Sequence, residues 1–448
     1  MHPLREFAKD LLSAEVWKAR LVFWAGAIVV GLVAVFFAKA ADYANGLFRH
    51  LITYSPWLPL AVTPIILMLV AWLTIRFFPG SQGSGIPQAM AALEMREQAL
   101  RQPLLSLRIV IGKIVLTLLG LLSGASIGRE GPTVHIGASI MFSIGRLAKF
   151  PFHYMDRGLI LAGSAAGIAA AFNTPLAGVV FAIEEMSRSF EERTNGTLIT
   201  AVIIAGVTAV ALLGNYTYFG TTDATLGAES PWPAVFICGV AGGLLGGLFS
   251  LIIVRGTRWL APWQRRRPLL IAIGCGLVIA AAGVLSGSQT YGTGYEEARE
   301  LLTQTGTLGS SYFFYKFLAT VASYLSGIPG GIFAPSLATG AGLGAVIGHW
   351  LPGTPIAVVI LLGMVGYFAG VVQTPITSFV IVVEMTANHE LVLPLMATAF
   401  IAYVVSKLIC PTAIYQELAI AFRPPQEAPK PEGEDEAKPA PASERGTP

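Results

Sequence analysis

An arginine and a glutamate, Arg129 and Glu130, interrupt an otherwise uncharged stretch of the chain. Residues 114–128 before them and 131–145 after them carry no charged side chain. A helix of about fifteen residues is roughly 22 Å long, so neither flank crosses the ~30 Å hydrocarbon core of a bilayer. We expect two part-way helices that meet inside a membrane, with Pro132 opening the second and Glu130 at its positive end. An ionisable residue at membrane depth is by default a functional candidate.

The composition predicts an all-α polytopic membrane protein in a lipid bilayer. Of the 448 residues, 54% are hydrophobic and only 12% are charged, whereas about a quarter of a soluble domain is charged. Uncharged runs that are long enough to span as helices recur along the chain, at residues 21–38, 56–75, 158–183 and 234–254. The net charge of +3 gives no indication of a nucleic acid partner.

The basic residues predict the orientation in the membrane. Residues 1–20 mix charged and apolar side chains, as in an amphipathic helix on the cytoplasmic surface. Spans at 21–38 and 56–78 would return the chain to that side, where the positive-inside rule also places the next basic residues, Arg96, Arg101, Arg108 and Lys113. Residues 423–448, rich in Pro, Glu, Lys and Ala, predict a disordered tail. We expect the protein in the inner membrane of the cell, with both termini in the cytoplasm.

An internal repeat divides the membrane domain, residues 21–422, into approximate halves at 79–213 and 268–422. Thr174-Pro175 precedes an apolar run that ends at Glu184, and Thr374-Pro375 precedes one that ends at Glu384. Upstream, the segment 128–132 aligns with 331–335, and Gly137 and Gly145 then match Gly340 and Gly348. Such halves are typical of transporters whose site lies between repeats of broken helices. This similarity alone leaves open whether the copies are parallel or inverted.

The two copies differ at the charged pair, because Ile332 and Phe333 replace Arg129 and Glu130. Both copies nevertheless place Gly and Pro around a helix start, where unpaired backbone N–H groups carry partial positive charge. Two such starts that converge would bind an anion without a buried cation. A third segment, Gly83 to Pro87, has the same pattern and adds a hydroxyl donor at Ser84.

Together these three segments resemble the CLC family of chloride channels and proton-coupled chloride transporters. They have the sequences GSGIP, GREGP and GIFAP, in that order, and the resemblance extends over residues 21–422. It implies two inverted repeats of broken and tilted helices, and a homodimer with one complete anion pathway in each subunit. Chloride is then the substrate, and we expect neither a cofactor nor a bound metal.

The resemblance also implies roles for individual residues. Chloride would be bound at a central site by the hydroxyls of Ser84 and Tyr415 and by the backbone N–H groups of Ile332 and Phe333. The gate and external anion site would consist of Arg129, Glu130 and Gly131. The carboxylate of Glu130 would compete with chloride when it is ionised and leave the site when it is protonated.

Proton transfer would need a second carboxylate on the cytoplasmic side, and the resemblance indicates Glu185. Glutamate at this position is common in the exchangers of the family and is missing from many of its channels. We therefore favour chloride/proton antiport, with Glu130 and Glu185 transferring protons. A passive voltage- or proton-gated chloride channel is the alternative. Glu184 and Glu384 are expected to have structural roles.

Two enzyme motifs occur in unsuitable surroundings. Gly124 to Gly128 matches GxSxG around Ser126, but a nucleophile elbow needs a strand-turn-helix context and His and acid partners. An HExxH pattern begins at His389 but has Leu393 in place of the second His. An intramembrane hydrolase that uses Ser126 is the remote alternative. We expect that the protein is not an enzyme. The three cysteines have no metal-ligand spacing and are expected in packing roles.

Overall fold

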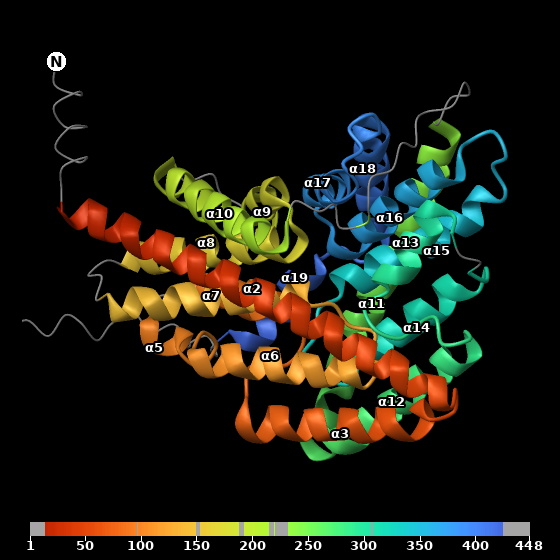
Figure 1. Cartoon of the computed structure of the whole chain (residues 1–448), viewed down its shortest axis with the longest axis horizontal. Coiled ribbons are helices and arrows are strands. Elements are labelled where there is room, and N and C mark those ends of the chain that lie inside the picture. The colour runs from red at the N-terminus through yellow and green to blue at the C-terminus, as the bar shows by residue number, and fades with distance from the viewer. Residues whose placement is uncertain are drawn as a thin grey trace, which may run out of the picture.

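Helices joined by loops make up the described part of the chain, and Figure 1 shows their arrangement in the computed structural model. The described residues are 14–95, 97–148, 153–187, 192–214, 219, 232–305 and 308–423. Within them, strand-like pairing is limited to two isolated bridges. The expected tail, except residue 423, and residues 1–13 of the expected surface helix lie outside the described part.

The first half of the chain forms helices α2 to α10. Their bounds are α2 (Ala14–Tyr54), α3 (Pro59–Phe77), α4 (Ile86–Glu94), α5 (Gln98–Arg101), α6 (Leu107–Leu122), α7 (Glu130–Leu147), α8 (His153–Phe172), α9 (Pro175–Phe181), the π-helical turn η1 (Ala182–Ser187) and α10 (Glu192–Leu213).

The second half forms helices α11 to α19. Their bounds are α11 (Trp232–Arg266), α12 (Pro268–Leu285), α13 (Tyr295–Thr303), α14 (Tyr312–Leu325), α15 (Phe333–Gly348), α16 (Ile356–Val372), α17 (Pro375–Thr386), α18 (Val392–Ile409), α19 (Ile414–Ala419) and the 3₁₀ turn η2 (Ile420–Phe422). In Figure 1, α7 extends to one side of the molecule and α15 to the other.

Five helices in the described residues are long and apolar enough to cross a membrane: residues 20–54 of α2, together with α3, α11, α12 and α18. The chain is therefore a multi-pass membrane protein, as its composition predicted. The first span is longer than expected, because α2 begins at Ala14 and continues past residue 38 to Tyr54 without a break. Its internal charges do not end the helix; Asp42, for example, pairs with Arg129 of the α7 segment.

Glycines bring helix backbones into direct contact. A Cβ at Gly340 or Gly344 would lie 2.7 or 2.6 Å from backbone oxygens of α16, and one at Gly363 would lie 2.5 Å from Gly344 Cα. Such small residues allow close approach between membrane helices. Cys238 and Cys410 are buried free thiols, which agrees with packing roles for them.

Candidate functional site

The three glycine- and proline-containing segments meet at one point, where their backbones bond to one another. Gly83 N donates to Ile328 O at 3.1 Å, and Gly330 N donates to Gly83 O at 3.0 Å. Gly128 N donates to Gly331 O at 2.7 Å, and Gly331 N returns a bond to Gly128 O at 2.8 Å. These contacts belong to two isolated bridges between the repeats, a parallel one at Gly83 and an antiparallel one between Gly128 and Gly331. The three segments therefore converge, as the sequence predicted.

Three helices start at this junction. Their N-cap residues are Gly85 for α4, Arg129 for α7 and Ile332 for α15. Gly85 has a φ of 98°, a left-handed conformation that side chains disfavour. The first N–H groups of each helix have no intrahelical acceptor and carry partial positive charge. The junction therefore has the electrostatics of an anion site, although Pro132 is the third residue of α7 and not its first.

Two hydroxyl side chains face the junction from α4's N-terminal loop and from α19. Ser84 and Tyr415 are both fully buried, and the Tyr415 ring lies 6.0 Å from the ring of Phe333 between centroids. The two hydroxyls are close neighbours, but neither forms a hydrogen bond of ordinary geometry within the described residues. Because an unpaired buried hydroxyl is costly, an anion that accepts from both would fit here.

The gate candidate, Glu130, is the first residue of α7 and is fully buried. Its carboxylate folds back over the preceding loop, since a methyl group at Gly128 would overlap Glu130 Oε2. A methyl group at Gly131 would in turn overlap Ser84 Oγ. The carboxylate, the hydroxyl and the helix start are therefore packed together at the centre of the molecule.

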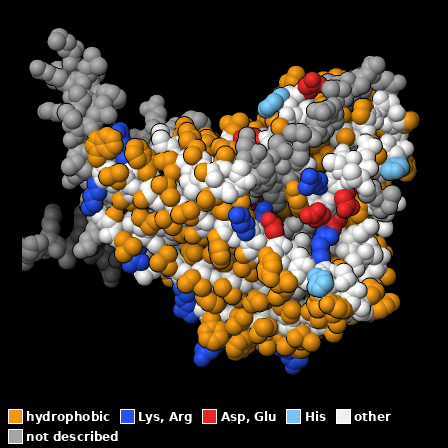
Figure 2. Space-filling model, viewed as in Figure 1, with side chains coloured by type: hydrophobic (Ala, Val, Ile, Leu, Met, Phe, Trp, Pro, Cys, Tyr) orange, Lys and Arg blue, Asp and Glu red, His pale blue; other side chains and the backbone are white. Residues whose placement is uncertain are grey.

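Arg129 extends away from the junction toward α2. Its Nη1 donates to Ala38 O at 2.8 Å and to Asp42 Oδ1 at 2.7 Å. Here it lines a cavity of about 580 Å³, which we call the charged cavity. Six charged side chains line it: Lys39, Asp42, Arg49, Arg129, Glu296 and Glu300. Figure 2 shows acidic and basic groups gathered on this face among broad hydrophobic areas.

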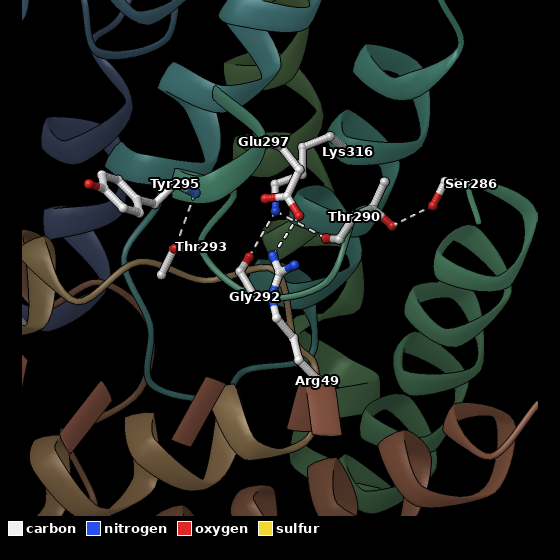
Figure 3. Close-up of polar contacts among 8 residues, drawn as sticks. All are labelled: Arg49, Ser286, Thr290, Gly292, Thr293, Tyr295, Glu297 and Lys316. Carbon is white, nitrogen blue, oxygen red and sulfur yellow. Dashed lines mark hydrogen bonds and ion pairs between the residues drawn. The ribbon is translucent and has the colours of Figure 1, made fainter. Parts of the chain in front are cut away.

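A polar network that sequence reasoning missed supports one wall of the charged cavity (Figure 3). Arg49 Nη2 of α2 donates to Glu297 Oε1 of α13 at 2.5 Å, and the Glu297 side chain is 4% exposed. The buried Lys316 of α14 donates to Thr290 O at 3.0 Å and to Gly292 O at 2.8 Å. The network joins elements that are distant in sequence, so no local spacing could have revealed it.

Two basic residues that the sequence analysis used as cytoplasmic markers are fully buried. Lys113 donates to Gly83 O at 2.6 Å and so supports the loop that carries Ser84. Arg101 donates to Met95 O at 2.6 Å and pairs with Asp156 at 3.1 Å. Both side chains therefore stabilise the fold, and the cytoplasmic placement of this segment stays a prediction.

Glu185 lies in the π-helical turn η1, and it is 2% exposed. Phe181, one turn earlier, lies 6.2 Å from Phe333 between ring centroids, and Phe333 contacts Tyr415. Both Glu185 and Glu130 interact electrostatically with Tyr415. The structure thus places the two candidate proton carriers around one aromatic group, and their roles stay predictions.

Ser126, the nucleophile of the hydrolase alternative, links two helical segments. Its Oγ lies 2.9 Å from Thr320 Oγ1, and its N–H donates to Ser323 Oγ at 2.9 Å. These contacts give it a structural role. Among the described residues, no three His, Cys, Asp or Glu side chains are grouped in a way that could hold a metal ion.

Comparison with known proteins decides the family. A family model described as "Voltage gated chloride channel" matches residues 66–407. The chain belongs to this family, the CLC proteins. The resemblance seen in the three segments is therefore confirmed, as is the fold of two inverted repeats that it implied.

Individual CLC relatives match over nearly the same length. The H(+)/Cl(-) exchange transporter ClcA of Yersinia pestis bv. Antiqua (strain Angola) is 30% identical over an alignment of 421 positions that covers 87% of this chain and 85% of the relative. ClcA of Vibrio cholerae serotype O1 (strain M66-2) is 31% identical over an alignment of 429 positions that covers 87% of this chain and 86% of the relative.

Solved CLC structures have the same architecture. A slow cyanobacterial Cl⁻/H⁺ antiporter has a TM-score of 0.77 at 27% identity, over 90% of this chain and 97% of the antiporter. A CLC-type fluoride/proton antiporter has a TM-score of 0.78 at 25% identity, over 91% and 99% of the two chains.

Proposed function

We propose that this CLC protein is a chloride/proton antiporter. The observation that carries the proposal is the position of Glu130, a fully buried carboxylate on the first residue of α7. An anionic side chain at an anion-binding helix start competes with a free anion for the same N–H groups. Protonation removes that competition, so proton binding and chloride binding are linked at one site. The ClcA relatives and the cyanobacterial antiporter, all named for exchange of these two ions, support the proposal.

Chloride in this mechanism occupies two positions. The central one lies between the hydroxyls of Ser84 and Tyr415 and the N–H groups of Ile332 and Phe333, at the start of α15. The outer one is the place of the Glu130 carboxylate, near the backbone of Arg129 to Gly131. Because these donors are neutral or partial charges, they bind a halide without holding it as tightly as a buried cation would.

Protons in this mechanism move between two carboxylates. Glu130 accepts a proton when it swings away from the junction, and Glu185 exchanges that proton with the cytoplasm. Glu185 is 2% exposed, so its carboxylate is shielded from bulk water in this conformation. A transporter needs such shielding, because carboxylates that were open to water on both sides at once would let protons leak.

We propose that the protein is a homodimer in a cell inner membrane, with both termini of each subunit in the cytoplasm. Large apolar side chains are exposed on α9, α10, α17 and α18, among them Leu176, Ile203, Ile376 and Phe400. In the dimer, part of this surface would face the second subunit and the rest would face lipid. Chemical cross-linking across these helices, with the purified protein reconstituted in bilayers, tests the assembly. A cross-linked dimer supports the homodimer, and a protein that stays monomeric contradicts it.

Reconstituted vesicles test the proposed function. With a chloride gradient and the membrane potential clamped at zero, we expect protons to move uphill as chloride moves down its gradient. Chloride flux without proton movement would establish a passive channel instead. A Ser126→Ala variant should keep its transport, whereas a hydrolase mechanism would depend on that hydroxyl. Glu185→Gln should pass chloride and lose proton movement; full coupling in this variant would place the internal acceptor elsewhere.

A further inference from the structure

Glu184 and Glu384 occupy equivalent positions in the two repeats, and each carboxylate binds the start of the other repeat's helix. Glu384 Oε1 accepts from Leu176 N at 3.0 Å, and its Oε2 accepts from Ala177 N at 2.6 Å. These are the second and third residues of α9, whose N–H groups lack intrahelical acceptors. An acidic group that accepts from them also benefits from the positive end of the helix.

The reverse contact has nearly the same geometry. Glu184 Oε1 accepts from Ile376 N at 3.1 Å, and its Oε2 accepts from Thr377 N at 2.6 Å. Thr377 Oγ1 adds a third bond to Glu184 Oε2 at 2.7 Å. The two helices begin alike as well, since the φ and ψ angles are −128° and 79° at Thr174 and −121° and 84° at Thr374. We call this pair of contacts the reciprocal clamp.

The reciprocal clamp holds both ends of the segment that carries Glu185. Glu384 binds the first turn of α9, and α9 continues directly into η1. Glu184 lies inside η1 and binds α17 from there. Residues 175–187 are therefore fixed to the second repeat at the beginning and near the end, and Glu185 directly follows the second of these contacts.

The two repeats differ at the residue that follows each clamping glutamate. Glu185 follows Glu184 in a π-helical turn, whereas Met385 follows Glu384 in α17, which stays α-helical to Thr386. A π-helical turn is rare and occurs frequently at functional sites. The clamp is thus symmetric, while the carboxylate and the altered helix beside it occur in one repeat only.

We propose that Glu184 and Glu384 are positioning residues for proton transfer, because the reciprocal clamp fixes the turn that aims Glu185 at the Tyr415 side of the molecule. This inference rests on the proposed role of Glu185 as the internal proton acceptor. Glu384 is the more informative of the two, because it lies in the other repeat and acts on Glu185 only through the backbone of α9 and η1.

The test measures the ratio of protons to chloride ions moved by Glu384→Gln in reconstituted vesicles. The amide keeps one acceptor but turns an N–H group toward a backbone N–H. We expect the ratio to fall by about fivefold, the effect of losing one helix-end cap, while chloride turnover changes less. Glu390→Gln, at an exposed carboxylate near the same helix, is the matched control and should keep the parent ratio.

A purely structural clamp predicts a different outcome. Glu384→Gln would then unfold at a lower temperature and slow both ions in proportion, with the ratio unchanged, and this result would overturn the proposal. If Glu384→Gln does not fold, Thr377→Val removes only the third bond to Glu184 and should lower the ratio to a smaller extent. If folded Thr377→Val keeps the proton-to-chloride ratio of the parent protein, that result would also overturn the proposal.

Glu185→Gln separates failure of the clamp from failure of the proposed function. If Glu185→Gln stops proton movement and the clamp variants keep the parent ratio, the antiport mechanism holds and the clamp is only structural. If Glu185→Gln itself keeps the parent ratio, the acceptor assignment fails and the positioning role fails with it.

Discussion

Gly128 and Gly331 donate to each other's carbonyl oxygens, at 2.7 and 2.8 Å, so one antiparallel bridge joins the two repeats at the candidate anion site. A Cβ at Gly331 would lie 3.0 Å from Gly131 N, so the start of α7 is also close to this bridge. The site is consequently shared, and neither repeat forms it alone. A change on either side of the bridge should alter anion binding.

Glu130→Gln should separate the two ions. The amide mimics the protonated acid, so it cannot carry a proton and competes more weakly with chloride than a carboxylate does. We expect chloride flux in vesicles to continue and proton movement to fall by about a hundredfold or more, the usual cost of losing a proton-transferring group. Proton pumping at the parent rate would refute the gate assignment.

Gly131→Ala should weaken chloride binding. The added methyl group would overlap Ser84 Oγ, and overpacking of this kind costs about 1–3 kcal/mol. Isothermal titration of chloride into the detergent-solubilised protein measures the change in Kd. Gly274→Ala is the matched control, because a Cβ at that position in α12 meets nothing within 4 Å. Equal Kd values for both variants would show that Ser84 does not contact the ion.

Tyr415→Phe should reduce chloride affinity moderately. The variant keeps the ring that packs against Phe333 and loses one hydroxyl donor, which contributes about 0.5–1.5 kcal/mol. The Kd for chloride should therefore rise between about twofold and tenfold. Tyr367→Phe removes another buried hydroxyl without a hydrogen-bonding partner in the described residues, so it is the control and should leave the Kd unchanged. The opposite pattern would remove Tyr415 from the site.

Asp42→Asn should speed chloride entry through the charged cavity. It removes a negative charge beside Arg129, and the Asp42 side chain is 73% exposed, so the amide can be accommodated there. We expect faster initial chloride uptake at low ionic strength, and no difference at roughly 1 M impermeant salt, where the Debye length is about 3 Å. Glu94→Gln, which removes a partner of the exposed Arg423 pair, is the control. A difference that persists in high salt would indicate a structural effect instead.

The helix starts at the three glycine- and proline-containing segments could be predicted from sequence because each segment signals its own start, and the resemblance to the CLC family implied that they share one site. The end of a helix is harder to predict when its charges have distant partners. The long helix α2 shows this, because the expected span ended at residue 38, whereas the helix continues past Asp42, which pairs with Arg129. The burial of Lys113 was missed for the same reason, since its acceptors are carbonyl oxygens about 30 residues away.

The repeat in the sequence predicted that Glu184 and Glu384 were equivalent, and it predicted structural roles for them. It could not predict that each binds the helix start of the other repeat. That contact joins residues 193 positions apart, and it depends on the relative orientation of the halves, which spacing along the chain does not encode. The charged network of Arg49, Glu297 and Lys316 could not be predicted for the same reason, because its members lie on three separate helices.

The glycine contact between α15 and α16 limits how this protein can move. With Gly344 and Gly363 backbones in direct contact, the two helices cannot slide past each other unless they first separate, which would open a void in the tightly packed interior. Any motion that separates α15 from α16 would have to break this contact in each cycle. We therefore expect α15 and α16 to move as one rigid body.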